Sequence, residues 1–142
     1  MLNTQPWSLE IRDRDVLLFE RTDLVLRYQD PPGRDRAISS GAAVANLRLG
    51  LRMIGRGGSL SLLPDTHRPE LVARFTMTGT AQPSDEDRRW HAAITRRRSY
   101  RRQFTRQQVS AARLDMLLRA APVGDVRAIP LRDPEHLAVL AG

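Results

Sequence analysis

The chain has 142 residues, of which 41% are hydrophobic, so it is long enough to bury the core of one ordinary domain. It contains no cysteine, which excludes disulfide bonds and thiolate metal sites, and its three histidines, His67, His91 and His136, are too scattered to suggest a metal-ligand cluster. No apolar run approaches the length of a membrane span, and the N-terminus lacks the charged-then-apolar order of a signal peptide, so we expect a cytoplasmic protein.

The positive charge of the chain is concentrated in one segment. The formal net charge is +7, and all 23 basic residues are arginine. Residues 96–106, RRRSYRRQFTR, hold six arginines and no acidic residue, which leaves 17 basic against 16 acidic residues in the rest of the chain. A nearly neutral chain with one intensely positive segment favours a local anion site over an extended nucleic-acid surface.

Short strands are predicted at the start of the chain. Apolar or alternating residues occur at 8–12 and 16–20, on either side of the turn-like Asp13-Arg14-Asp15. A third run of this kind follows at 24–28, so two or three short strands are predicted.

A long buried helix is predicted after these strands. Apolar residues recur at helical spacing over 38–54, beyond a strong break at Asp30-Pro31-Pro32-Gly33. Ser39 or Ser40 is the expected N-cap, and the small residues near the start of the helix would let another backbone approach closely. The strands predicted beyond this helix are 59–63 and 71–78.

Two more helices, a strand and a short final helix are predicted in the rest of the chain. Ser84 is the expected N-cap of a helix with an acidic first turn and an apolar face that includes Trp90. A second helix is expected to begin near Ser110. Residues 126–131 predict a strand, and Asp133 is the expected cap of the final helix.

Two short segments carry residue types that suit a polar ligand. Arg97-Arg98-Ser99-Tyr100-Arg101 combines hydroxyl groups with guanidinium groups, whose forked donors match phosphate oxygens. In Asn3-Thr4-Gln5-Pro6-Trp7, two carboxamides could read the edge of a heterocycle while the tryptophan ring packs behind them. From these residues alone, a solvated basic loop and a loop-to-strand junction stay open as alternatives.

Taken together, the two segments resemble motifs of the FMN-dependent nitroreductase family. Residues 3–7, NTQPW, are similar to the end of the family's "PS..N.QPW" stretch, and residues 94–104, ITRRRSYRRQF, are similar to its "RRS.R.F" stretch. Residues 40–51, SGAAVANLRLGL, resemble its small-residue central helix. The arginine motif follows the proline-tryptophan motif here, the reverse of the usual order, which resembles the tandem, two-copy proteins of the mycobacterial dormancy-associated type.

The resemblance implies an α+β fold, a nitroreductase-like sandwich of antiparallel sheet and helices in incomplete form. Residues 1–80 would be the latter part of a first copy, and residues 81–142 would be the beginning of a second copy. The Pro and Ser that the family motif places before its asparagine are absent before Asn3. The chain therefore resembles a truncated gene product, the product of a mis-called start, or one piece of a longer protein.

The resemblance also implies a cofactor. The residues that would bind FMN are Asn3, Gln5, Arg97, Arg98, Ser99 and Arg101. The arginines and the serine would hold the phosphate and ribityl end, and the two carboxamides would face the isoalloxazine ring from the other copy. NAD(P)H would be the electron donor, and a nitroaromatic or quinone-like small molecule would be the acceptor. No general acid or base is nominated, no metal is expected, and the protein would be a homodimer or depend on segments outside this chain.

Three functions follow from these observations. The first is an NAD(P)H-dependent, FMN-binding nitroreductase-like oxidoreductase. The second is a flavin-binding or flavin-sequestering protein with little turnover. The third is a nucleic-acid-binding module that uses the arginine segment, which the nearly neutral remainder and the single interleaved aromatic residue, Tyr100, disfavour. Neither nucleic acid nor membrane is an expected partner.

Overall fold

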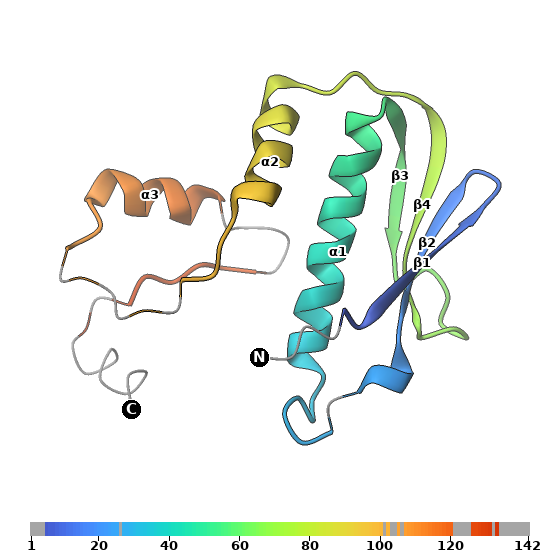
Figure 1. The fold of residues 1–142 in the computed structure, drawn as a ribbon, viewed down its shortest axis with the longest axis horizontal. Helices are drawn as coiled ribbons and strands as arrows, with labels where there is room; N and C mark the ends of the chain where they lie inside the picture. The colour runs from blue at the N-terminus through green and yellow to red at the C-terminus, as the bar shows by residue number, and fades with distance from the viewer. Residues whose placement is uncertain are drawn as a thin grey trace. The chain divides into compact units, whose positions relative to one another are not determined.

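The computed structural model of the chain describes residues 5–25, 27–100, 102, 105, 107–120, 126–131 and 133. The chain divides into two compact units, Met1–Ser99 and Tyr100–Gly142, and each is described here by itself. In the part of the chain that the structure describes, no helix is long and apolar enough to cross a membrane. The first unit carries the sheet (Figure 1). Among the described residues, all the buried side chains belong to this unit.

An antiparallel sheet forms one layer of the first unit. Within the described residues it has four strands in the order β1-β2-β4-β3. The strands are β1 Trp7–Arg12, β2 Asp15–Glu20, β3 Arg56–Leu62 and β4 Leu71–Thr80. Arg12 pairs with Asp15, so β1 and β2 form a hairpin around the predicted turn. The antiparallel sheet together with helices confirms the predicted α+β class, and the strands predicted at 8–12, 16–20, 59–63 and 71–78 are confirmed with small shifts of their ends.

The helix α1, Arg34–Met53, lies across one face of this sheet (Figure 1). Alternate residues of a strand point to the same face, so the apolar positions of β2 and β4 meet the helix together. Two clusters of buried side chains join the layers. The first consists of Leu18, Ala43, Val44 and Ala73, and the second of Val16, Leu51 and Phe75. One face of the predicted helix is therefore buried, while Ile38 and Ile54, the two ends of the predicted range, are exposed.

The start of α1 differs from the prediction. The helix begins at Arg34, and Ser40, one of the two serines predicted to cap it, is buried inside it. The carboxylate of Asp30 instead accepts hydrogen bonds from the backbone N–H groups of Asp35 at 3.2 Å and Arg36 at 2.9 Å. Gly33 supplies the turn between Asp30 and the helix with a φ of 74°, a conformation that residues with a Cβ rarely adopt. The prediction failed because the cap lies before the turn and not beside the first apolar residue.

Replacing Asp30 with alanine should lower the midpoint of thermal unfolding at neutral pH, because two backbone donors of the first turn of α1 lose their acceptor. The N–H of Arg36 is the main cause that holds the pKa of Asp30 below its ordinary value of 3.8. A carboxyl whose pKa is lowered by folding stabilises the protein above its unfolded pKa and loses this effect as the pH falls through its folded pKa. The difference between wild type and Asp30→Ala should therefore shrink as the pH falls from about 6 to about 2.

Thermal unfolding followed by circular dichroism across this pH range is the measurement. Asp35→Ala is the matched control, because it removes the same charge from an exposed position in the first turn of α1. A difference between wild type and Asp30→Ala that stays constant with pH would contradict the assignment of Asp30 as the ionised cap.

The predicted strand at 24–28 is wrong for the residues that the structure describes. Thr22–Leu24 form a 3-10 turn, η1, residues 27–29 form another turn, and Leu26 lies outside the described residues. The physical reason is the lack of a partner, since β1 pairs with β2 only as far as Glu20 and β4 pairs with it only as far as Phe19. An ion pair between Glu20 and Arg36 then joins the end of β2 to the first turn of α1.

Two further helices follow the sheet. The helix α2, Asp85–Arg96, belongs to the first unit and lies against α1 (Figure 1). The sequence prediction assigned these residues to a second copy of the fold, and that boundary at residue 80 stays a prediction. The helix α3, Ala111–Ala120, belongs to the second unit. Its predicted start near Ser110 is confirmed, because the hydroxyl of Ser110 accepts a hydrogen bond from the backbone N–H of Arg113 at 3.4 Å.

The strand predicted at 126–131 is wrong. Only Val126 forms a β-bridge, and the described residues after it have no strand structure. Val126 and Ile129 are exposed, so the segment lacks the burial that stabilises a strand, and Pro130 has no backbone N–H to donate. The final helix predicted to follow Asp133 falls at 134–142, outside the described residues.

Candidate functional site at the C-terminal end of α2

The N-terminal end of α2 is closed by the predicted serine. The hydroxyl of Ser84 accepts a hydrogen bond from the backbone N–H of Asp87 at 3.1 Å, and the carboxylate of Asp87 accepts one from the backbone N–H of Ser84 at 2.9 Å. This reciprocal arrangement is a capping box, and it satisfies donors that would otherwise lack partners. The prediction of Ser84 as the N-cap is confirmed.

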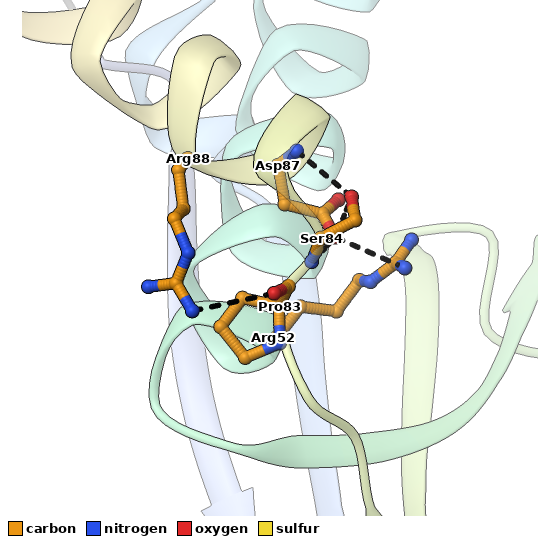
Figure 2. A network of polar contacts seen from close by, with 5 residues as sticks. All are labelled: Arg52, Pro83, Ser84, Asp87 and Arg88. Carbon is orange, nitrogen blue, oxygen red and sulfur yellow. Dashed lines mark hydrogen bonds and ion pairs between the residues drawn. The ribbon is translucent and has the colours of Figure 1, made fainter.

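The same carboxylate also binds α1. Figure 2 shows Arg52, near the end of α1, reaching toward Asp87, and an ion pair joins their side chains at 3.1 Å. The side chain of Asp87 is 4% exposed and that of Arg52 is 37% exposed. The N–H of Ser84 is the main cause that lowers the pKa of Asp87, and the hydroxyl of Ser84 and the charge of Arg52 act in the same direction. Asp87 is therefore ionised at neutral pH and holds the start of α2 on α1.

The rest of α2 packs loosely on α1. An open groove of about 550 Å³ lies between the two helices. Its lining includes Leu49, Arg52, Asp87, Trp90 and Ile94. Trp90 and Ile94, from the predicted apolar face of α2, line this groove. They are not buried there, because Trp90 is 57% exposed and Ile94 is 37% exposed.

The C-terminal end of α2 is covered by arginine side chains. Arg96 donates to the carbonyl oxygen of Ala92 at 3.1 Å, and Arg98 donates to the carbonyl oxygens of Thr95 at 2.7 Å and Arg97 at 2.9 Å. The last carbonyls of a helix carry partial negative charge and lack partners within the helix, so these guanidinium groups stabilise its end. Part of the basic segment thus has a structural role that the sequence reasoning did not identify.

Arg97 and Ser99 differ from this pattern. The guanidinium of Arg97 lies 3.5 Å from the hydroxyl oxygen of Ser99, at the outer limit of a hydrogen bond, and both side chains are exposed. Arg98, also exposed, uses one of its terminal nitrogens on the helix carbonyls, and arginine carries five N–H donors. The structure therefore brings Arg97, Arg98 and Ser99 together, with donors left that face solvent.

The other predicted site residues are less completely described. Asn3 and Arg101 lie outside the described residues. Gln5 is exposed and has a φ of 41°, and its carbonyl oxygen accepts a hydrogen bond from the N–H of Trp7 at 2.7 Å. Trp7 is the first residue of β1 and packs against the first core cluster, so residues 5–7 form the junction between a loop and this strand. Among the described residues, no hydrogen bond or ion pair links Gln5 to residues 97–99. The predicted FMN contacts stay predictions.

Comparison with known proteins places these motifs in context. No family model matches the chain. Two proteins of Mycobacterium tuberculosis, from strains CDC 1551 / Oshkosh and ATCC 25618 / H37Rv, are each 30% identical to it over 126 residues. Both are named as putative NAD(P)H nitroreductases. This similarity supports a relationship between the chain and a nitroreductase family. The aligned region covers 87% of this chain but 36% of each relative, so the chain spans little more than a third of the proteins that it matches.

The ion pair between Arg52 and Asp87 was not predicted from the sequence. The spacing of Ser84 and Asp87 is a local signal that predicts the capping box. Nothing local marks Arg52 as the partner of Asp87, because it lies in a different helix with β3 and β4 between them in the sequence. This contact depends on how α2 folds back onto α1.

Proposed function

We propose that the chain is part of an NAD(P)H-dependent, FMN-binding nitroreductase-like oxidoreductase. In this proposal Arg97, Arg98, Ser99 and Arg101 hold the phosphate and ribityl end of FMN, and Asn3 and Gln5 face the isoalloxazine ring from another copy of the fold. The observation that carries it is the similarity to relatives named as NAD(P)H nitroreductases, which extends over 87% of the chain. Because the chain spans about a third of the length of these proteins, the proposal includes further segments or a second chain that complete the site.

The described part of the candidate site fits a phosphate group chemically. Three exposed residues in sequence, Arg97, Arg98 and Ser99, offer guanidinium and hydroxyl donors. Arginine matches phosphate oxygens through paired N–H groups. A helix C-terminus by itself disfavours an anion, because its carbonyls are partially negative. The hydrogen bonds from Arg96 and Arg98 to these carbonyls offset that disadvantage.

The chain's own residues would bind and orient the cofactor and would not take part in proton transfer. FMN, when bound, would supply two-electron redox chemistry between NAD(P)H and a nitroaromatic or quinone-like acceptor. Arg97 and Ser99 would bind the phosphate, while Arg98 would combine phosphate binding with its contacts to the helix carbonyls. The carboxamide of Gln5 can both donate to and accept from the polar edge of the ring.

Replacing Arg97 with alanine should weaken FMN binding by about 10- to 100-fold, because a hydrogen bond to a charged group contributes about 1.5–3 kcal/mol. Arg97 is the sharpest test, since its guanidinium is not used on the helix carbonyls as those of Arg96 and Arg98 are. Arg89→Ala is the matched control, because it removes the same charge from an exposed position within α2, away from its C-terminal end. Flavin fluorescence quenching with purified protein gives both affinities.

If Arg97→Ala and Arg89→Ala weakened FMN binding equally, only the overall charge of the protein would attract FMN. Wild-type protein that binds no FMN would overturn the proposal. Strong, salt-sensitive DNA binding that persists at saturating FMN would favour the nucleic-acid alternative instead.

Turnover separates the oxidoreductase from a protein that only binds or sequesters flavin. The assay is NAD(P)H oxidation by flavin-loaded protein with a nitroaromatic acceptor. Steady turnover supports the oxidoreductase, and flavin-loaded protein without turnover supports the sequestering function.

A further inference from the structure

Among the described residues, one ion pair joins α2 to α1, between Asp87 and Arg52, and the charge of Arg48 in α1 also acts on Asp87. Of the 12 residues of α2, all of which the structure describes, only Asp87 is buried. Trp90 and Ile94 remain partly exposed beside the groove, so apolar packing does little to fix the helix. The carboxylate of Asp87 meets both Ser84 in the capping turn and Arg52 of α1 (Figure 2).

This contact lies at one end of α2, and the candidate phosphate-binding residues lie at the other. Arg97 follows the helix directly. A helix rises about 1.5 Å per residue, so Asp87 and Arg97 are roughly 15 Å apart along its axis. A tilt of about 10° around Asp87 would move Arg97 by roughly 3 Å. Such a shift exceeds the narrow range of distances over which a hydrogen bond forms.

We propose that the ion pair between Asp87 and Arg52 is a positioning contact for phosphate binding, because it fixes α2 on α1 and so determines where Arg97, Arg98 and Ser99 meet the phosphate of FMN. This inference rests on the proposed function, since it takes FMN as the ligand. Asp87 and Arg52 are positioning residues, which act through α2 and do not touch the cofactor. The two ends of α2 thus have different tasks, one in orientation and one in binding.

The test compares FMN with riboflavin, which lacks the phosphate. Arg52→Gln removes the ion pair and leaves the hydrogen bonds between Ser84 and Asp87 in place. We expect it to weaken FMN binding about tenfold and riboflavin binding by less than about twofold, since the lost contacts are those to the phosphate. Arg52→Lys, which keeps the charge, should restore part of the FMN affinity. Arg21→Gln is the matched control, because it breaks the exposed ion pair with Asp23 in the same unit.

Hydrogen exchange adds a readout that does not depend on the ligand. Backbone amides of α2 should exchange faster in Arg52→Gln than in wild type, while those of β2 and β4 should be unchanged. Asp87→Asn is a second variant and should show the same selective loss of FMN affinity.

The possible failures are distinguishable. Wild-type protein that binds FMN together with an Arg52→Gln variant of equal affinity would overturn the positioning role and leave the proposed function intact. Equal loss of FMN and riboflavin binding would also overturn it, because the effect would then not concern the phosphate. Wild-type protein that binds neither flavin would overturn the proposed function and this inference with it.

Discussion

Replacing Leu18 with alanine should lower the free energy of unfolding by about 3 kcal/mol or more. Leu18 is 0% exposed and belongs to the first core cluster, together with Ala73, its register partner in β4, and with Ala43 and Val44 of α1. Truncation removes the apolar surface that Leu18 buries and leaves a cavity that a helix and a sheet cannot both close. Urea titration followed by circular dichroism measures the change.

Leu9→Ala is the matched control for this substitution. Leu9 pairs directly with Leu18 across the β1–β2 hairpin, but it is 49% exposed because β1 is an edge strand. The same truncation should cost about 1 kcal/mol or less there, since less apolar surface returns to water. If the two variants were equally destabilised, the assignment of the core to the face shared by β2, β4 and α1 would be wrong.

Replacing Gly58 with alanine should destabilise the protein by about 3 kcal/mol or more, and it should do so without removing any contact. A Cβ at this position would collide with the backbone carbonyl oxygen of Thr76 and would lie 2.8 Å from a ring carbon of Phe75. The pairing of β3 with β4 shifts register between Gly57 and Gly58, and the close approach occurs at this irregularity. A backbone carbonyl cannot rotate away as a side chain can, so the strands must separate or change register.

The control for Gly58 is Gly79→Ala in the adjacent strand. A Cβ at Gly79 would meet nothing within 4 Å, and its φ lies outside the left-handed region. Alanine restricts the unfolded chain more than glycine does, so this substitution should be neutral or stabilising by up to about 1 kcal/mol. Thermal unfolding of both variants is the measurement, and similar midpoints for the two would exclude a steric origin.

Features governed by neighbouring residues could be predicted from the sequence. The hairpin turn between β1 and β2 and the cap at Ser84 each depend on a few consecutive residues, and both are confirmed. The cap of α1 was missed because Asp30 acts across a turn that Gly33 makes possible. The predicted strand at 126–131 has apolar and β-branched residues, but strand structure also needs a partner and burial, which a propensity does not supply.

In the candidate site, too, local features could be predicted from the sequence and tertiary contacts could not. The similarity of the arginine segment to a phosphate-binding motif could be recognised in the sequence, and the structure places Arg97, Arg98 and Ser99 together because they are adjacent. That Arg98 also stabilises the end of α2 follows from where the helix stops, which the sequence pattern leaves uncertain by several residues. The contact of Arg52 with Asp87 depends on tertiary packing and has no local signal.

The strand order has a consequence for how the first unit folds. Each edge strand forms a local hairpin with its neighbour, β1 with β2 and β3 with β4, so these pairings close short loops. The central pairing of β2 with β4 instead joins segments separated in the sequence by α1 and β3. Pairings between distant segments carry a larger loss of chain entropy and form more slowly. We therefore expect the two hairpins to assemble early. We expect their association in the presence of α1, which buries Leu18 and Phe75, to limit the folding rate.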